Sequence, residues 1–344
     1  MYGIRPCGYP RMVLKQILGL YRDKGWRPVV APELEFFLVK VNPDSDYPLE
    51  PPVGRSGRPE TARQAFGIDA VNEFDPLFED IYDYCEAQEI DIDTLSHEAG
   101  AAQMEINFNH GNPLELADQA FLFKRTVRQA ALDHNVYATF MAKPMQDEPG
   151  SAMHVHQSLY DMSGSQNLFA MEDGRHSAAF LHFIGGMQKY LPAALPFLAP
   201  YVNSYRRLVP DSDAPINMHW GVDNRTTGLR VPVSPPNQRR VENRVAGADV
   251  NPYLAMAASL ACGYLGLVEE IEPSAPIETS AYSLAAKLPR YLEDALLRLN
   301  RAKPLKEIMG ERFVDVFTSV KLAESAAYQK VISAWEREYL LLNV

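Results

Sequence analysis

Cysteine is scarce in this sequence of 344 residues. Cys7, Cys85 and Cys262 are its three cysteines; they are widely separated, and no Cys-x-x-Cys pair is present. This pattern excludes a disulfide framework and gives no support to a thiolate zinc cluster. It indicates a protein of a reducing compartment, and we expect it to be cytoplasmic.

Lysine and arginine are outnumbered by acidic residues. The chain carries 33 Lys and Arg against 44 Asp and Glu, a formal net charge of -11. Such a chain repels the phosphate backbone of nucleic acids and the surface of anionic lipid, so we expect neither a nucleic-acid nor a membrane partner. The hydrophobic share of 47% and the charged share of 22% are ordinary for a globular protein, which excludes a disordered chain.

Long apolar segments are nearly absent as well. Residues 1–6 contain no apolar run followed by a small-residue cleavage site, so we expect no signal peptide. Residues 250–268 carry no charge over 19 positions, which approaches the length of a membrane span. Because this segment contains Asn251, Pro252 and two glycines and is followed by two glutamates, we interpret it as a helix buried in a globular core.

Several signatures of nucleotide-binding and hydrolytic enzymes are missing. The sequence has no Gly-x-x-x-x-Gly-Lys-Ser/Thr loop and no Gly-x-Gly-x-x-Gly that opens a helix after a strand. It also has no Gly-x-Ser-x-Gly turn. These absences argue against a P-loop protein, a dinucleotide-binding fold and a serine hydrolase of the α/β type.

Hydrophobic periodicity predicts an α+β fold. We expect helices at residues 11–24, 70–88, 114–134, 252–270, 289–298 and 322–341. We expect strands at residues 29–39, 103–109, 137–142, 151–160 and 240–245, with a loop at 42–59. This mixture is typical of an antiparallel β-sheet with helices packed on one face.

The polar faces of the predicted strands have an unusual composition. A half-exposed strand alternates polar and apolar residues for reasons of burial alone, so a single such face carries little information. Here the polar positions are acidic, imidazole or guanidinium groups: Glu33, Glu35, Glu105, His154, His156, Arg240, Glu242 and Arg244. If these strands share one sheet, the carboxylates repel one another by a few kcal/mol at ~4 Å unless cations lie between them. Oxygen ligands with at most one imidazole suit Mg²⁺ or Mn²⁺, and the set is large enough for two ions.

Arginine is concentrated in one short part of this acidic chain. Seven arginines lie within 39 residues: Arg206, Arg207, Arg225, Arg230, Arg239, Arg240 and Arg244. A solvated face or an interface would explain such a run by itself. Beside a carboxylate cage, however, guanidinium groups that match phosphate and carboxylate oxygens indicate phosphoryl transfer.

The ordered motifs resemble the catalytic domain of the glutamine synthetase family over nearly the whole chain. The blocks that carry the resemblance are Glu33-Leu34-Glu35-Phe36-Phe37, His97-Glu98 leading to Gln103-Met104-Glu105, Lys143-Pro144-Met145, Met153-His154-Val155-His156-Gln157-Ser158-Leu159, Asn203-Ser204-Tyr205-Arg206-Arg207-Leu208-Val209-Pro210, Asn224-Arg225, Leu229-Arg230-Val231-Pro232, Arg239-Arg240-Val241-Glu242-Asn243-Arg244 and Asn251-Pro252-Tyr253-Leu254. The resemblance implies a glutamine synthetase/guanidino kinase-like sheet that spans residues 1–344. We expect no counterpart of the family's small N-terminal β-grasp domain within residues 1–344, and the resemblance implies a homo-oligomer, a dodecamer of two stacked hexamers.

The resemblance also implies roles for individual residues. One metal ion would be held by Glu35, Glu98 and Glu105, and a second by Glu33, His154 and Glu242. The residues that would bind ATP are His156, Ser158, Arg230, Arg240 and Asp93. Glutamate would be held by Gly150, Arg207 and Arg244. Arg225 and Arg207 would act on the phosphorylated intermediate, and Asp213 would lie beside the incoming amine.

The chemistry implied by the resemblance is a two-step ligation of glutamate and a small amine. ATP phosphorylates the γ-carboxylate of glutamate, and the amine then displaces phosphate from the γ-glutamyl phosphate. Two substrate classes remain open, because the chain departs from the ammonia-using enzymes of the family. It has Asp213 where they carry glutamate, Glu148-Pro149-Gly150 where they carry an asparagine before the glycine, Asp223 in place of an arginine, and Asn237-Gln238 in place of a lysine.

The shorter side chain of Asp213 favours an acceptor larger than ammonia. Aspartate has one methylene fewer than glutamate, so its carboxylate withdraws by ~1.5 Å and leaves room for an alkyl amine. Residues 148–154 and 217–221 are similar to the branch of the family that makes γ-glutamyl amides of putrescine and related polyamines. An ammonia-using glutamine synthetase, a ligase for another amine such as ethanolamine, and a non-catalytic member of the family are the alternatives. The presence of all six predicted metal ligands argues against the last of these.

Overall fold

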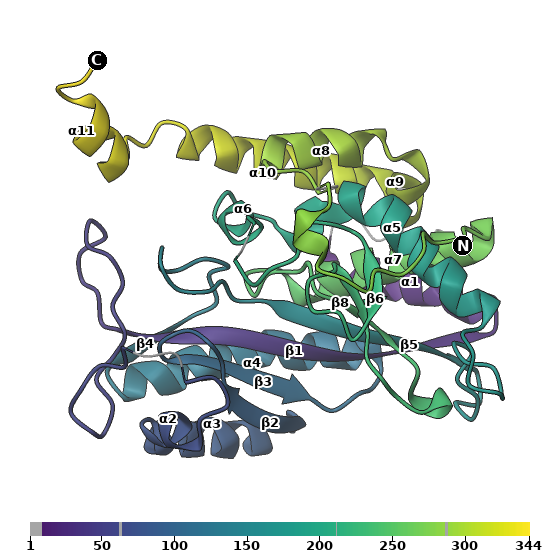
Figure 1. Cartoon of the computed structure of the whole chain (residues 1–344), viewed down its shortest axis with the longest axis horizontal. Helices are drawn as coiled ribbons and strands as arrows, with labels where there is room; N and C mark the ends of the chain where they lie inside the picture. The colour runs from purple at the N-terminus through teal and green to yellow at the C-terminus, as the bar shows by residue number, and fades with distance from the viewer. Residues whose placement is uncertain (1–8, 62–63, 211, 286–287) are drawn as a thin grey trace, which may run out of the picture.

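A long central strand organises the sheet of this computed structural model, which describes residues 9–61, 64–210, 212–285 and 288–344. β1 runs from Trp26 to Lys40 and pairs with three other strands (Figure 1). Within the described residues the strand order is β2-β3-β1-β5-β8-β7-β6, with β4 also paired to β1. The other strands are β2 (Ile92–His97), β3 (Gln103–Phe108), β4 (Val136–Thr139), β5 (Met153–Asp161), β6 (Trp220–Val222), β7 (Leu229–Val231) and β8 (Val241–Asn243). Cys7 and residues 1–6, for which we expected no signal peptide, lie outside the described residues.

The sheet is mixed, which corrects the prediction of a purely antiparallel one. The other pairings, including all those of β1, are antiparallel, but β6 and β7 are parallel, with Trp220 opposite Leu229. Each of these two strands is only three residues long. Six connecting residues are enough to return the chain to the start of so short a strand, since an extended residue spans about 3.3 Å. The α+β class with flanking helices is confirmed.

The two faces of β1 have different environments. Leu34, Phe36 and Leu38 are fully buried in the main hydrophobic core, beneath α1 (Pro10–Asp23) and α4 (Pro113–Asp133). Side chains alternate between the faces of a strand, so Glu33 and Glu35 face away from those helices. The alternation predicted for this strand is therefore confirmed, and one face of the sheet is left for polar side chains.

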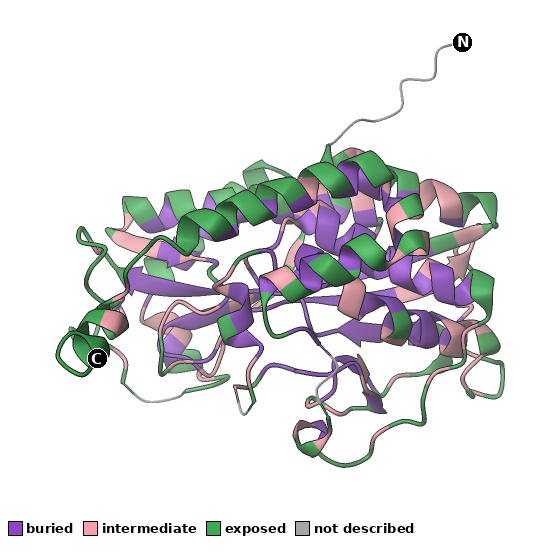
Figure 2. Ribbon diagram, turned by 90° about the horizontal axis from the view of Figure 1, so that it is seen from above, coloured by how far each residue is buried: buried purple, intermediate pink, exposed green. Residues whose placement is uncertain are grey.

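Two helices cross at the centre of the helical layer. α5 (Ala178–Leu198) and α7 (Pro252–Glu269) make the most extensive helix–helix contact of the protein, and the strands and inner helix faces are buried (Figure 2). α7 is the helix predicted from the uncharged segment at 250–268. Among the described residues it is the one helix long and apolar enough to cross a membrane, and 78% of this helix is buried inside the protein. The interpretation as a core helix is confirmed.

Two predicted helices are interrupted. The segment predicted as one helix at 70–88 consists of α2 (Ile68–Asn72) and α3 (Asp75–Ala87), because Pro76 begins a new helix. The helix predicted at 322–341 was wrong: α10 (Glu311–Tyr328) ends earlier, and α11 (Ala334–Leu340) starts at a capping box of Ser333 and Glu336. The helix predicted at 289–298 is α8 (Leu292–Arg301). The periodicity gave no prediction for α5, for α6 (Ser204–Arg207) or for α9 (Lys303–Met309).

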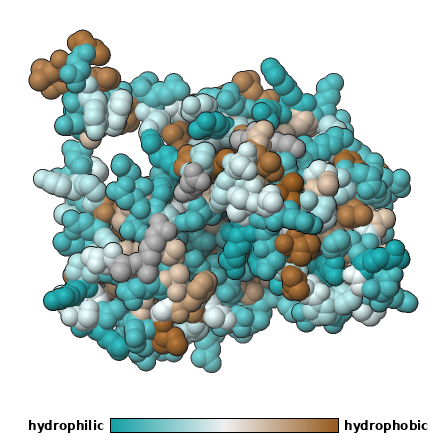
Figure 3. Space-filling view, in the orientation of Figure 1, coloured by the Kyte–Doolittle hydropathy of each residue, from teal (hydrophilic) through white to brown (hydrophobic). Residues whose placement is uncertain are grey.

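The C-terminal segment projects from the body of the protein. α11 lies at the far end of an arm that follows α10 (Figure 1), and the tip of this arm is strongly hydrophobic (Figure 3). Trp335, Leu341 and Leu342 are exposed there, with Leu342 at 89%. Such a cluster of exposed apolar residues is typical of a contact surface.

The crossing of α5 and α7 predicts a sharp difference between two glycine substitutions. A Cβ atom on Gly266 would lie 2.6 Å from the Cα atom of Gly186 and would collide with the carbonyl oxygen of His182. We expect Gly266→Ala to lower the free energy of unfolding by about 2 kcal/mol or more, because the two backbones must separate. Gly19 lies within α1 and has no atom within 4 Å of the same position. Gly19→Ala should instead raise stability by about 0.5–1 kcal/mol. Urea denaturation of both variants tests this; similar effects would contradict the packing argument.

Candidate active site

The strand register brings the predicted polar residues into one row across the sheet. β1 lies between β3 and β5, and β8 lies between β5 and β7. Directly opposed residues in adjacent strands lie within about 5.5 Å of each other, so the predicted residues become neighbours. The opposed pairs are Glu35 and Glu105, Glu33 and His154, His156 and Glu242, and Arg230 and Glu242.

Glu33 is held between two imidazole rings. Its Oε1 atom lies 2.8 Å from Nε2 of His156, and its Oε2 atom lies 3.3 Å from Nδ1 of His154. Arg240 donates from Nε to Nδ1 of His156 at 3.3 Å, so the proton of that imidazole is on Nε2 and faces Glu33. Burial disfavours the charge on Glu33, but the hydrogen bonds from both histidines outweigh burial and lower the pKa of its carboxyl.

Glu242 is a fully buried carboxylate paired with two arginines. Arg230 donates to its Oε2 atom at 2.8 Å, and Arg244 donates to its Oε1 atom at 2.5 Å. Burial opposes ionisation here too, but the positive charge of Arg244, followed by the two histidines, lowers the pKa of Glu242 to about 2. Glu242 is therefore ionised at neutral pH and available as a ligand.

The neighbouring carboxylates are under the opposite influence. Burial, together with the charge of Glu98, raises the pKa of Glu35 to about 8. Burial, with the charges of Glu33 and Glu35, raises the pKa of Glu105 to about 9, and burial also raises the pKa of Glu98. These carboxylates hold protons because the protein itself supplies too few cations. A divalent cation would take the place of those protons.

The donor set fits hard divalent ions. Two groups have one donor atom from each residue within 4.8 Å of the others: Glu33 with Glu105 and His154, and Glu33 with His156 and Glu242. Burial lowers the pKa of His154 to about 4, so this imidazole is neutral at pH 7, as a metal ligand must be. Carboxylate oxygens with one imidazole per group suit Mg²⁺ or Mn²⁺. The structure groups these residues differently from the predicted division into two ligand sets, and it brings His156, predicted to bind ATP, into one of the groups.

The second half of the site is cationic. Arg207 is buried, and its guanidinium donates to the carbonyl oxygens of Val245 and Arg244 at 2.9 and 3.1 Å. Gly150 packs directly against it, because a Cβ atom there would lie 2.6 Å from Cγ of Arg207 and 2.6 Å from the carbonyl oxygen of Ala142. Any side chain at position 150 would therefore displace Arg207.

A cavity of 420 Å³ joins the two halves. It contains most of the residues that the sequence singled out: Glu33, Glu35, Glu98, Glu105, Gly150, His154, Arg207, Asp213, Arg225, Arg230 and Arg244. His156 and Glu242 contact its wall through Glu33 and Arg230. Ser158 lies further along β5, where it donates to the carbonyl oxygen of Arg239 at 3.0 Å, and Asp93 is exposed on β2. The nucleotide-binding roles of Ser158, Arg240 and Asp93 remain predictions.

Sequence reasoning missed two residues that hold this site together. Gln103 is buried and donates from Nε2 to Glu35 at 3.3 Å and to the carbonyl oxygen of Gly150 at 3.0 Å, so it links the carboxylate half to the arginine half. Its place two residues before Glu105 on the same strand face was the available signal. Glu60 comes from the loop after β1 and contacts His97. No pattern in the sequence marks that loop residue.

Comparison with known proteins gives matches over nearly the whole chain. The family model described as "Glutamine synthetase, catalytic domain" matches residues 8–340. The chain is 37% identical over 338 residues to γ-glutamylputrescine synthetase PuuA of Escherichia coli, covering 97% of this chain and 71% of that protein. It is 35% identical to glutamine synthetase of Pyrococcus abyssi, covering 94% of this chain and 73% of that protein. The solved structure "Apo GmaS without ligand" superposes with a TM-score of 0.85 at 28% identity, covering 99% of this chain and 79% of that one.

The raised pKa values of the site predict how stability depends on pH. Glu35 and Glu105 have pKa values of about 8 and 9 in the folded protein, against an ordinary value of 4.5. Their contribution is fully present below pH 4.5 and is lost as the pH rises through 8 and 9, because the folded state binds more protons than the unfolded state in that window.

We therefore expect the melting temperature of protein treated with a chelator to fall between pH 5 and pH 9. Added Mg²⁺ or Mn²⁺ should reduce that fall, since the cation replaces the protons. Glu105→Gln removes one ionising carboxyl, so the melting temperature of the chelator-treated variant should depend less on pH. A melting temperature of the chelated protein that is constant over this range would contradict the assignment.

Proposed function

This chain belongs to the glutamine synthetase family, and we propose that it joins the γ-carboxylate of glutamate to a polyamine such as putrescine. Proteins of this family are ATP-dependent ligases that use divalent metal ions. The single observation that carries the proposal is the row of carboxylates and histidines facing buried arginines in one cavity. A site of that kind neutralises phosphate on one side and holds a carboxylate substrate on the other.

Each part of the cavity has a distinct task in the proposed reaction. Six residues would hold divalent ions, which supply charge neutralisation for the phosphates of ATP: Glu33, Glu35, Glu98, Glu105, His154 and Glu242. The buried guanidinium of Arg207, already fixed by two carbonyl oxygens, binds the carboxylate substrate in a set orientation. Fixing it in advance lowers the entropy cost of bringing the γ-carboxylate to the phosphoryl group.

The reaction then balances in two steps. An oxygen of the γ-carboxylate attacks the terminal phosphorus of ATP, and ADP leaves. The amine nitrogen attacks the resulting acyl phosphate at carbon, phosphate leaves with the bonding electrons, and the nitrogen loses a proton. We propose that Arg225, which lines the cavity, stabilises the transferred phosphoryl group and that Asp213 lies beside the amine. Water must be kept away from the acyl phosphate, which hydrolyses readily.

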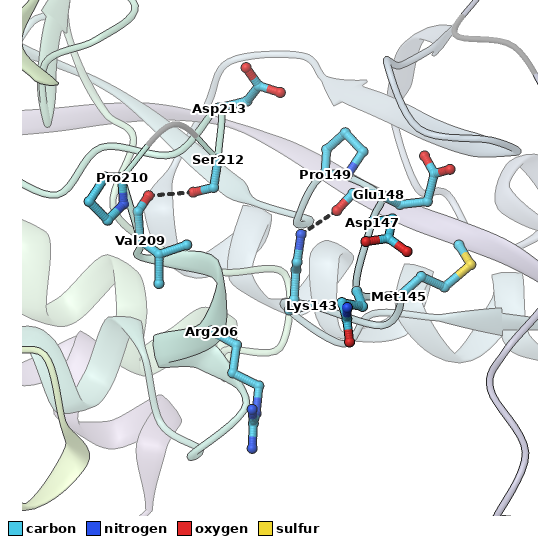
Figure 4. Close-up of a pocket in the computed structure, with 11 residues that line it drawn as sticks. Lys143, Met145, Asp147, Glu148, Pro149, Arg206, Val209, Pro210, Ser212 and Asp213 are labelled. Carbon is cyan, nitrogen blue, oxygen red and sulfur yellow. Dashed lines mark hydrogen bonds between the residues drawn. The ribbon is translucent and has the colours of Figure 1, made fainter. Parts of the chain in front are cut away.

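A second cavity beside Asp213 supports an acceptor larger than ammonia. It has a volume of 540 Å³ and shares Pro149, Ser212 and Asp213 with the metal-side cavity (Figure 4). An ammonium ion would need none of this space. An alkyl amine whose reacting nitrogen lies near Asp213 would extend into it.

The lining of this second cavity suits a cationic alkyl chain. Asp147, Glu148 and Asp213 contribute carboxylates, and Met145 and Val209 contribute apolar surface. The two cations of the lining have other partners: Lys143 donates to the carbonyl oxygen of Glu148, and Arg206 donates to the hydroxyl of Tyr328 at 2.7 Å. A diamine combines an apolar chain with terminal ammonium groups and matches this arrangement.

The second candidate function is ammonia-dependent glutamine synthesis, which the similarity to archaeal glutamine synthetases favours.

We further propose a cytoplasmic homo-oligomer. The thiols of Cys85 and Cys262 are buried and free, in agreement with a reducing compartment. The exposed apolar tip of the arm that carries Trp335, Leu341 and Leu342 supports a contact with a further copy of the chain.

Phosphate release tests the proposed activity. The protein is incubated with glutamate, ATP and Mg²⁺, and with ammonium, putrescine, spermidine, ethanolamine or no amine in parallel. We expect turnover with the polyamines and little with ammonium. Turnover chiefly with ammonium would establish the second candidate function, and the absence of turnover with every amine would reject ligation to these acceptors.

Two carboxylates of the second cavity predict changes in amine preference. Asp213→Glu should raise kcat/KM for ammonium relative to putrescine, because the longer side chain fills the space near the reacting nitrogen.

Asp147 is exposed in the lining, so Asp147→Asn should leave the fold intact. It should raise KM for putrescine by roughly threefold to fivefold, since a partly exposed ion pair contributes about 1 kcal/mol or less. n-Butylamine, of equal length with one amine, should show no such change in KM.

The matched control is Asp83→Asn, an exposed aspartate on α3 that lines neither cavity. Its KM for putrescine should equal that of the unmodified protein. If Asp147→Asn raises KM for n-butylamine as much as KM for putrescine, the second cavity does not bind the distal ammonium group.

A further inference from the structure

A buried pair of ionisable side chains, His97 and Glu60, contacts the backbone of Glu98, which lines the cavity of the predicted metal ligands. His97 ends β2, and its side chain is fully buried; Glu60 comes from the loop after β1, and its side chain is 9% exposed. Neither residue lines the cavity of the metal ligands. The reaction described above gives this pair no task, although burying ionisable groups is costly unless they are fully used in hydrogen bonds.

The ring of His97 connects Glu60 to the backbone of Glu98. Its Nδ1 atom lies 2.6 Å from the carbonyl oxygen of Glu98, and its Nε2 atom lies 2.9 Å from Oε2 of Glu60. A carbonyl oxygen only accepts, so Nδ1 carries a proton and donates it to Glu98. Glu60 fixes the opposite side of the ring and thereby sets the direction of that donor.

Glu60 also holds the turn that follows Glu98. The same Oε2 atom accepts the backbone N–H of Ala102 at 2.8 Å. The backbone N–H of Glu98 in turn donates to the carbonyl oxygen of Gln103 at 2.8 Å. The turn between β2 and β3 is therefore fastened at both ends, and Glu98 projects from it into the cavity.

The pair ties a second wall of the cavity to the same point. The backbone N–H of Phe66 donates to the carbonyl oxygen of His97 at 2.8 Å, and Ala65 and Phe66 line the cavity beside Glu98. The loop that carries Glu60, Ala65 and Phe66 thus meets the sheet at His97. A displacement of His97 would move a carboxylate and a wall of the site together.

Burial distinguishes this pair from a similar one on the surface. His134 and Asp80 also form a histidine–carboxylate contact, at 2.7 Å, but their side chains are 29% and 41% exposed. Exposed pairs contribute little, because water competes for both groups. The contact of His97 with Glu60 is shielded from water, so its hydrogen-bond geometry is more strongly fixed than that of the His134–Asp80 pair.

We propose that Glu60 and His97 are positioning residues that fix Glu98 for binding a divalent cation, through the hydrogen bond from Nδ1 of His97 to the carbonyl oxygen of Glu98. The inference rests on the proposed role of Glu98 as a metal ligand. Groups that orient a metal ligand without touching the metal commonly change metal affinity tenfold to a hundredfold when removed. The carboxylate of Glu98 is itself unaltered by substitutions at either position, so a loss of affinity would report on its placement.

Two substitutions of His97 separate its two hydrogen bonds. Asparagine places its amide nitrogen near the position of Nδ1, and glutamine places its amide near the position of Nε2. His97→Asn should keep the bond to Glu98 and lose the bond to Glu60, whereas His97→Gln should do the reverse. The measurement is the dissociation constant of Mn²⁺ by electron paramagnetic resonance, with Mn²⁺ as the only added ligand.

We expect His97→Gln to weaken Mn²⁺ binding by roughly tenfold or more, and His97→Asn to remain within about threefold of the unmodified protein. The melting temperatures of the two variants should be lowered to a similar extent, because each variant loses one buried hydrogen bond. A merely structural role would therefore not separate them. Equal Mn²⁺ affinities in the two variants, whether lowered or unchanged, would overturn the proposal.

Glu60 provides an independent pair of variants that does not depend on the folding of the His97 variants. Glu60→Gln keeps an oxygen at the position of Oε2, which contacts both His97 and Ala102, and should bind Mn²⁺ within about threefold of the unmodified protein. Glu60→Ala should weaken binding by roughly tenfold, because it removes the partner of the His97 ring and of the Ala102 backbone N–H together, whereas His97→Asn keeps the contact with Ala102. Unchanged affinity in Glu60→Ala would overturn the proposal. The control, His134→Gln, removes the surface pair and should leave Mn²⁺ affinity unchanged. An unmodified protein that binds no Mn²⁺ would overturn the metal site and this inference together, whereas normal binding with insensitive variants would overturn the inference alone.

Discussion

Electrostatic repulsion among carboxylates on one buried sheet face is the constraint around which this protein is built. β1 carries Glu33 and Glu35 into a row that also receives Glu105 from β3 and Glu242 from β8. The protein offsets part of that charge itself, since two arginines pair with Glu242 and two histidines donate hydrogen bonds to Glu33. Burial and the repulsion that is not offset raise the pKa values of Glu35 and Glu105. The fold therefore creates a specific demand for cations, and an enzyme that must bind the polyphosphate of ATP needs cations at that place.

The residues of this row were predictable because strand periodicity assigns side chains to faces. Once Glu33 and Glu35 alternate with Leu34 and Phe36, burial of the apolar face leaves the glutamates together. What periodicity omits is which strands become neighbours, so the grouping of Glu33 with His156 and Glu242 emerged from the register alone. Loops carry even less signal. Glu60 and the cavity beside Asp213 depend on how segments distant in sequence fold against the sheet, and no local pattern reports that.

Two of the helical predictions failed for a related reason. Periodicity is continuous across residues 70–88 and 322–341, but Pro76 and the capping box at Ser333 each begin a new helix within the apolar pattern. Conversely, α5 is apolar nearly all round and contains Pro192 and Pro196, so it presents neither a clear stripe nor an uninterrupted propensity. Its position is decided by the glycine contacts with α7, which are tertiary.

The proposed function assigns metal binding and acceptor choice to different kinds of structure. The metal-side residues come mostly from paired strands, whose relative positions are fixed by the backbone hydrogen bonds of the sheet. The second cavity is lined by residues 143, 145–149, 206, 209–210 and 212–213, which lie outside the sheet. In the proposed reaction, changes in those segments would alter the space and charge offered to the amine without moving a metal ligand. The two cavities nonetheless meet at Pro149, and Gln103 ties the next residue, Gly150, to Glu35 through its bonds to the carboxylate and to the carbonyl oxygen. Under the proposed function, such a junction would let the acceptor cavity vary while the phosphoryl-transfer step stays the same.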